Sequence, residues 1–501
     1  MRRRSFLHYL AGGALAAFAT RLRAKIAPGT RYDVIIVGAG TAGLPAAIVA
    51  AERGARVLLL EAAPAVGGTL FLSTGQMSAA GTRLQRSKGI EDSPQQHYDD
   101  VMRISRNTAD PVLVRLAVNE AAATFDWLMD LGLKPLPEHP ILGAAHEPYS
   151  VARYAWGANG GRDILGVLTA PLAAQVAAGR IDLALDTSVT ALLTDRDGAV
   201  SGVRVKSADR ETIHRGRSTV LTCGGYAANA QLFEALSGYR HYGDMAYGYS
   251  KGAGIELALA VGGYVRGREN YLCNFGSILV NDLYPAKILG RFNTVPQDRP
   301  PWEIYVNVDG KRFICEDEPS VDRREHALLA QPDLRCWIIF DEAILAGAPP
   351  GVRNWSRDDI REAFATQMMF TRADSIAKLA DACGIDRDGL LATVAGYNEG
   401  VRRGRDALGR KHLPRPIVQP PFYAIRHQGH SVTSTVGVAV DGQLRVIRPG
   451  GAPIRNLYAA GELLGAGQTM GNAFVGGMMV TPALSFGRYL GRQLPLAAMN
   501  A

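Results

Sequence analysis

The sequence predicts an α/β protein whose first domain is discontinuous and is interrupted by an inserted α+β domain. Three observations lead to this prediction. An apolar strand at 32–37 runs into a glycine-rich turn and a helix, a second apolar strand follows at 56–60, and a similar strand occurs near the far end of the chain at 456–460. Strands separated by a helix usually pair in parallel. A chain of 501 residues also exceeds what one hydrophobic core organises.

The first strand and its turn form a motif with a physical purpose. Residues 32–37 are continuously apolar, as expected of a buried parallel strand, and 46–52 has the composition of a helix. In the G-x-G-x-x-G turn between them, the first glycine allows the tight turn and the second lets the backbone approach a pyrophosphate. The third lets the helix pack closely on the strand, and the helix N-terminus faces the negative charge. The residues predicted to hold the pyrophosphate are Gly38, Ala39, Gly40, Thr41, Ala42 and Gly43.

An acidic residue ends the second strand. Glu61 follows 56–60 and lies 18 residues past Gly43, where a carboxylate hydrogen-bonds the ribose hydroxyls of a dinucleotide. An isolated glycine motif is weak evidence. Strand, glycines, helix, strand and terminal acid in this order predict a dinucleotide site.

Two more segments indicate that the dinucleotide is FAD. A second glycine turn at 67–69 suits backbone approach to a pyrophosphate–ribityl chain, and the strand at 456–460 ends in Gly461 and Glu462. A C-terminal segment that returns to the nucleotide is a feature of FAD enzymes. The sequence contains no second strand–glycine–helix unit. We therefore expect no separate NAD(P)H domain, and electron exchange with an external carrier such as a quinone or a cytochrome.

Further motifs extend over most of the chain after residue 30. They comprise Gly67–Met77, Asp92–Pro111, Leu221–Gly225, Lys251–Ile255, Asn307–Phe313, Pro421–Ala424 and Thr481–Gly487. Together they resemble the flavoprotein superfamily of fumarate reductase and succinate dehydrogenase, with features of its ketosteroid dehydrogenase branch. The resemblance implies a Rossmann-type FAD-binding domain of the glutathione-reductase-like kind, with an inserted α+β cap domain.

The resemblance also implies which residues beyond the first turn contact FAD. The helix that opens at 481–487 is expected to direct its N-terminus at the flavin, where its dipole would stabilise the reduced anion. The remaining expected contacts are Gly68, Thr69, Thr74, Gly75, Val189, Gly224, Gly461, Glu462, Pro482 and Leu484.

Departures from the family pattern bear on the attachment of FAD and on the substrate. Residues 72–75 lack the histidine that attaches FAD covalently in succinate dehydrogenases, so we expect non-covalent FAD. Residues 433–438 lack the carboxylate-binding histidine of fumarate reductases, and Ala473–Val475 lack their arginine. Phe474 stands where ketosteroid dehydrogenases have a ketone-polarising tyrosine. Because a dicarboxylate needs cationic partners in a dry site, a small hydrophobic carbonyl substrate is favoured.

Three residues are candidates for the proton chemistry, and each has a structural alternative. Arg323 follows the cap motif, although a solvated surface arginine fits its position equally well. His430 precedes the segment that leads to the flavin turn and could bind a carbonyl, or could be a structural histidine. Tyr247 could donate a phenolic proton or could simply pack.

The predicted organisation follows from these motifs. The FAD-binding domain is expected at 30–264 and 416–495, and the cap at 265–415. The leading functional hypothesis is an FAD-dependent oxidoreductase acting on a CH–CH bond next to a carbonyl, as a ketone dehydrogenase or an enone reductase. One alternative is a periplasmic reductase of an unsaturated carboxylate. Another, of a different class, is a flavin-binding scaffold whose redox activity has lapsed.

The N-terminal residues indicate export. Residues 1–27 carry a twin-arginine pattern at Arg3 and Arg4, followed by an apolar stretch too short to span a bilayer. This predicts a twin-arginine leader, use of that export machinery, a periplasmic protein and no transmembrane anchor.

The net charge of +8 owes six charges to the first 25 residues, so nucleic acid is not an expected partner. The five cysteines form no CxxC motif, and no metal site is expected.

Overall fold

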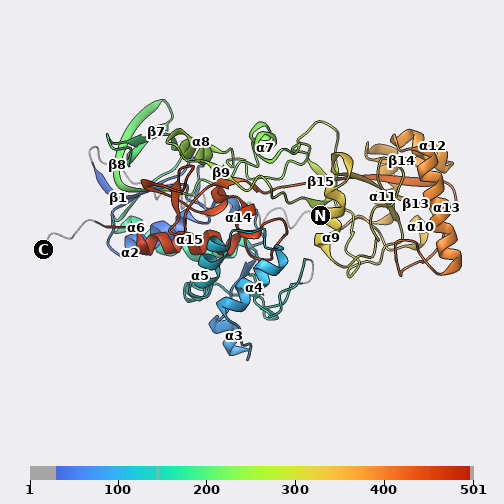
Figure 1. The fold of residues 1–501 in the computed structure, drawn as a ribbon, viewed down its shortest axis with the longest axis horizontal. Helices are drawn as coiled ribbons and strands as arrows, with labels where there is room; N and C mark the ends of the chain where they lie inside the picture. The colour runs from blue at the N-terminus through green and yellow to red at the C-terminus, as the bar shows by residue number, and fades with distance from the viewer. Residues whose placement is uncertain (1–29, 144–145, 497–501) are drawn as a thin grey trace.

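The computed structural model describes residues 30–143 and 146–496. Two large sheets lie toward the two ends of an elongated molecule (Figure 1). The predicted leader, 1–27, lies outside the described residues. Among the helices of the described ranges, none is both long and apolar enough to cross a membrane.

The first sheet contains the predicted nucleotide-binding unit. Its eight strands are β1 (Arg31–Val37), β2 (Val57–Leu60), β5 (Ile181–Ala184), β6 (Ser188–Thr194), β7 (Val200–Ser207), β8 (Arg210–Leu221), β17 (Arg445–Ile447) and β18 (Pro453–Ala459). The central order is β17-β18-β8-β1-β2-β5, and β6 and β7 form a hairpin that joins through β8. β18 pairs in parallel with β8, with Tyr458 opposite Val220. The late strand of the chain therefore returns to the sheet of the first strand.

Helices cover this sheet and bring the end of the chain onto the first glycine turn. They are α2 (Gly43–Glu52), α5 (Pro111–Asp130), α6 (Gly161–Ala177) and α15 (Val480–Gln493). α15 packs against both α2 and α5. A Cβ atom on Gly487 would lie 2.0 Å from the Ala42 carbonyl oxygen, so the two helices touch backbone to backbone.

The second sheet forms the core of the cap. Its six strands are β10 (Asn274–Leu279), β11 (Ile288–Gly290), β12 (Ile304–Val306), β13 (Arg335–Asp341), β14 (Phe370–Ala373) and β15 (Phe422–His430). The helices around it are α9 (Val321–Leu329), α10 (Glu342–Gly347), α11 (Arg357–Thr366), α12 (Ile376–Cys383) and α13 (Arg387–Arg403). Their grouping at one end of the molecule is visible in Figure 1.

The two connections between the sheets lie side by side. β9 (Val265–Arg266) leaves the first domain and pairs with β16 (Gly437–Val438), which leads back into it. The outgoing connection begins with β9. The return comes later than the expected residue 416, because β15 pairs with β13 and belongs to the second sheet up to His430.

Shorter elements complete the described fold. They are η1 (Gly68–Phe71), β3 (Met77–Ser78), α3 (Arg83–Ser87), α4 (Pro94–Ile104), β4 (Tyr154–Ala155), α7 (Ala230–Ser237), α8 (Ala253–Ala260), η2 (Pro332–Leu334), η3 (Gly461–Leu464) and α14 (Ala466–Met470).

Candidate functional site

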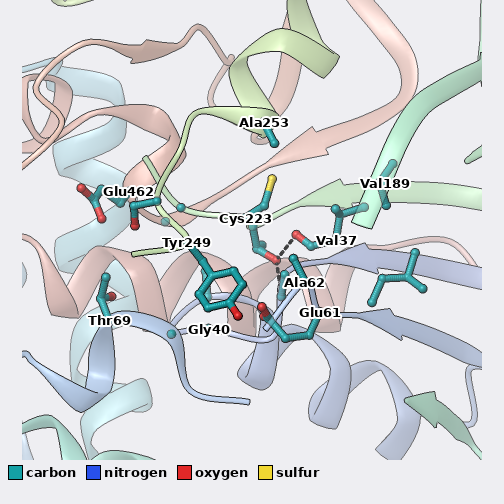
Figure 2. A pocket seen from close by; sticks show the side chains of 18 of the residues that line it. Val37, Gly40, Glu61, Ala62, Thr69, Val189, Cys223, Tyr249, Ala253 and Glu462 are labelled. Atoms are coloured by element: carbon teal, nitrogen blue, oxygen red, sulfur yellow. Dashed lines mark hydrogen bonds between the residues drawn. The ribbon is translucent and has the colours of Figure 1, made fainter. Parts of the chain in front are cut away.

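A cavity opens where the central strands of the first sheet end. It encloses about 850 Å³, counting its open mouth. Its walls come from the first glycine turn, the end of β2, the start of η1, β6, the turn after β8 and the start of η3 (Figure 2). Segments more than 400 residues apart in the sequence thus meet around one space.

Two glycines shape the floor of this cavity. A Cβ atom on Gly68 would stand 3.2 Å from the Cα atom of Gly40, so side chains here would close the groove between the two turns. Gly43 is needed for a different reason. Its Cβ atom would lie 1.8 Å from the Gly38 carbonyl oxygen, and only glycine lets α2 start this close to β1.

Glu61 is fixed at the edge of the cavity by backbone donors. The Ala39 N–H donates to its Oε2 and the Ala63 N–H to its Oε1, both at 2.8 Å. Burial raises the pKa of this carboxyl, and the backbone N–H groups oppose that shift. The two oxygens keep further acceptor capacity for hydroxyl groups of a ligand.

The three residues predicted for proton chemistry lie in different places. Arg323 is on the surface of α9 with its side chain 67% exposed, 3.0 Å from Glu318. His430 is fully buried at the end of β15, and its Nε2 is 3.0 Å from Ser277 Oγ. Tyr247 lines the cavity that also contains Glu61. The structure does not bring the three together around one substrate position.

A different group of side chains meets where the cap approaches the first domain. The ring of His146 stacks on that of Phe474, with centroids 4.0 Å apart. Burial and, to a smaller extent, the charge of Arg324 lower the pKa of His146 to about 4, against the opposing effect of Asp322 of α9. His146 Nδ1 is buried and has no hydrogen-bond partner among the described residues.

Arg324 is the buried neighbour of the exposed Arg323. It is 1% exposed, its Nη1 donates to the Thr294 carbonyl, and its guanidinium lies 5.9 Å from the centre of the Phe275 ring. Nη2 is buried and has no partner within the described ranges. Close by, the Ser320 hydroxyl, which caps α9, donates to Glu147 at 2.6 Å. Sequence reasoning missed His146, because it belongs to none of the motifs on which the resemblance rests.

Comparison with known proteins identifies the family. A family model described as an FAD binding domain matches residues 33–478. The chain belongs to this FAD-binding family of oxidoreductases. FAD is therefore its cofactor, and the sequence-based prediction of superfamily and fold class is confirmed.

The relatives include fumarate reductases and 3-oxosteroid 1-dehydrogenases. The chain is 32% identical to an NADH:fumarate oxidoreductase of Klebsiella pneumoniae over 92% of its own length, and spans 47% of that protein. It is 30% identical to a fumarate reductase (cytochrome) of Shewanella frigidimarina, covering 93% of this chain and 77% of the relative. A 3-oxosteroid 1-dehydrogenase of Mycobacterium tuberculosis is 25% identical over 91% of this chain and 97% of the relative. A solved flavocytochrome c3 fumarate reductase in its open conformation superposes with a TM-score of 0.68 at 27% identity, covering 93% of this chain and 78% of that one.

The cavity fits the FAD of this family. A glycine turn at a helix N-terminus suits the pyrophosphate, and a fixed carboxylate suits the ribose. Eleven of the residues predicted to contact FAD line it: Gly38, Gly40, Thr41, Ala42, Glu61, Gly68, Thr69, Val189, Gly224, Gly461 and Glu462.

The other predicted FAD contacts lie outside the lining of this cavity. Ala39 is buried and acts through its N–H on Glu61, and Gly43 through close packing of α2. Gly75 abuts the backbone of Gly160 and Gly161, where a Cβ atom would come within 2.4 Å. Thr74 is exposed at this turn. Pro482 and Leu484 are buried in the first turns of α15.

Sequence reasoning missed several residues of the lining, which are Thr187, Ser188, Cys223, Tyr249, Ser250 and Leu257. Most flank residues that were predicted, such as Val189 and Gly224. The signal for Tyr249 and Ser250 was their position just before the Gly252 turn. There, however, Tyr247 suggested a proton donor and not a wall of the cofactor site.

Proposed function

We propose that this chain is an FAD-dependent oxidoreductase that forms or reduces a carbon–carbon double bond next to the carbonyl of a ketone or cyclic enone. The substrate is assigned to the junction between the cap and the FAD domain. One observation carries the proposal: an apolar wall, Phe474, holds a half-buried neutral histidine, His146, whose buried Nδ1 has no partner in the described part of the chain. A neutral donor on an apolar wall suits an uncharged carbonyl better than two carboxylates.

The residues of the chain then have separate tasks. FAD, when bound, accepts or supplies the hydride. His146 donates a hydrogen bond to the substrate carbonyl oxygen, and its low pKa keeps it neutral near pH 7. The cap helix α9 and the segment around Glu147, joined by the Ser320 hydrogen bond, exclude water from the junction. Electrons leave or enter through an external quinone or cytochrome.

Reduction of an unsaturated carboxylate is the second candidate. Arg324 favours it, because its buried Nη2 has no partner in the described ranges and could donate to a carboxylate. The fumarate reductases among the relatives support the same direction. A lapsed flavin-binding scaffold is the third candidate, and it predicts no substrate-dependent turnover.

Two variants separate these candidates. With a ketone substrate, His146→Phe should lower kcat/KM about tenfold to a hundredfold, whereas Arg324→Gln should change it little. With an unsaturated acid, the ranking should reverse. Arg323→Gln is the matched control, since its exposed side chain should leave both activities unchanged. Wild-type kinetics for both substrate classes in His146→Phe would contradict the proposed role of His146.

We further propose that residues 1–27 direct twin-arginine export to the periplasm. Replacing both Arg3 and Arg4 by lysine should retain the protein in the cytoplasm in cell fractionation. Unchanged export would remove this assignment without affecting the proposed chemistry.

A further inference from the structure

The loop Tyr247–Ser250 places two tyrosines at the cavity of the cofactor. Both residues line the cavity, and their ring centres are 5.7 Å apart with planes inclined at 37°. Tyr249 is 48% exposed, although a large aromatic side chain normally gains from burial. In Figure 2 the Tyr249 ring and the Glu61 side chain point toward each other across the cavity. The exposed ring therefore stands over a binding site.

Backbone hydrogen bonds fix the base of this loop, and its tip at Gly248 borders open space. The Ser250 N–H donates to the Tyr247 carbonyl at 2.8 Å, and the Ser250 carbonyl accepts from the Ala228 N–H at 2.9 Å. Next along the chain, the Gly252 N–H donates to the Gly225 carbonyl at 3.0 Å. At the tip, a Cβ atom on Gly248 would meet no atom within 4 Å. Such a loop holds the two rings at the cavity, and the space beside Gly248 is open.

Glu61 identifies the half of FAD that these rings face. Its position at the end of β2 assigns it to the ribose of the adenosine. Tyr247 lines the same cavity as this carboxylate, and burial first and the Glu61 charge next raise the pKa of Tyr247 to about 12. Neither tyrosine is assigned a role as a proton donor. Both face the nucleotide end of the cavity and not the junction at Phe474.

We propose that Tyr249, supported by Tyr247, covers the adenosine half of bound FAD as an aromatic flap that slows its release. A flat ring stacks on a base whatever the base's hydrogen-bonding pattern, and in nucleic-acid complexes such contacts change affinity by about tenfold or more. The flap retains a cofactor that no histidine at 72–75 can attach covalently. This inference rests on FAD binding alone and is independent of the substrate.

FAD release from the holoenzyme tests the flap. The holoenzyme is diluted into buffer with excess ADP, which occupies the emptied site and prevents FAD from rebinding. The recovery of FAD fluorescence then gives the release rate. Tyr249→Ala should release FAD about tenfold faster or more, and Tyr249→Phe, which keeps the ring, should stay within about twofold of wild type. Leu283→Ala is the control, because Leu283 is also an exposed apolar side chain, at 80% exposure, but does not line the cavity.

Binding of ADP to the FAD-stripped protein locates the effect. Tyr249→Ala should weaken ADP binding by a factor similar to that for FAD, since ADP carries only the adenosine half. Unchanged release in Tyr249→Ala would overturn the proposal, as would release by Tyr249→Phe that is as fast as that of Tyr249→Ala. Faster FAD release with unaltered ADP affinity would also overturn it, because the contact would then lie elsewhere on FAD. Tyr249→Leu provides a second variant should the alanine variant fold poorly, and it should release FAD faster than Tyr249→Phe.

Discussion

At the scale of single residues, FAD binding depends on Glu61, the carboxylate at the end of β2. Both its oxygens accept backbone N–H groups, so the side chain cannot turn away from the ribose position. Glu61→Gln should weaken FAD binding by about tenfold to a hundredfold, because an amide nitrogen would face a backbone donor and one charged acceptor is lost. Titration of the apoprotein with FAD by fluorescence quenching measures this. Glu52→Gln, at the exposed end of α2, should bind normally, and a normal Kd for Glu61→Gln would contradict the assignment.

A second residue-scale prediction concerns pH. His427 is fully buried, and burial holds its pKa near 3, with a further contribution from Arg291. As the pH falls below about 6.5, the unfolded chain takes up a proton on this histidine and the folded chain does not until near pH 3. Stability should therefore decline on acidification by about 1.4 kcal/mol per pH unit for this residue. Urea unfolding between pH 7.5 and 5 should show a shallower pH slope for His427→Phe than for wild type, and equal slopes would disprove the contribution.

Arg323 and Arg324 show why some of the site could not be predicted from the sequence. A helix turns about 100° per residue, so neighbours on α9 point in different directions. The run Asp322–Glu325 is charged throughout and offers no apolar stripe to orient the helix. Only the packing of α9 on the cap decides that Arg324 is buried and Arg323 exposed.

At the scale of elements, the contact between α2 and α15 holds the cofactor site together. Gly487→Val would force atoms into the Ala42 carbonyl, which lies 2.0 Å from the position of a Cβ atom. We expect a loss of about 1–3 kcal/mol of stability, or more, together with weaker FAD binding. Thermal unfolding with and without FAD measures both effects.

The matched control lies in another helix of the same domain. A Cβ atom on Gly166 of α6 would meet nothing within 4 Å, so Gly166→Ala should be neutral or slightly stabilising. If Gly487→Val and Gly166→Ala changed stability and FAD binding equally, the close contact between α2 and α15 would not be the cause of the effect.

The elements themselves were largely predictable, for reasons that differ along the chain. β1, β2 and α2 follow from a local pattern of apolar residues and glycines, and the return of 456–460 to their sheet was anticipated from its composition. β15 was not assigned to the cap, because its partners β10, β13 and β14 lie about 50 residues or more away and strand pairing is set by non-local contacts. Tyr247 was recognised as a candidate, but the cavity it faces depends on the fold.

At the scale of the whole molecule, the cap is a unit with its own buried ionic core. Arg312, from the motif at 307–313, pairs with Glu316 and Asp406, all three being nearly inaccessible. Arg312→Ala leaves two buried acids without this partner and should cost about 3–5 kcal/mol in the cap. Because FAD binds to the other domain, the variant should still bind FAD while its cap unfolds at lower denaturant concentration.

The control is Arg323→Ala, at an exposed ion pair, which should cost less than about 1 kcal/mol of stability. Loss of FAD binding in Arg312→Ala would show that the two domains do not fold separately.

We propose that the FAD of this chain exchanges a hydride with a carbon–carbon bond next to an uncharged carbonyl, and an anaerobic absorption titration can test this exchange. The oxidised holoenzyme is titrated with saturated ketones, steroids included, and the dithionite-reduced enzyme with cyclic enones and unsaturated acids. We expect a ketone to bleach the flavin band or an enone to restore it. Reoxidation by an unsaturated acid, with no response to any ketone or enone, would contradict it.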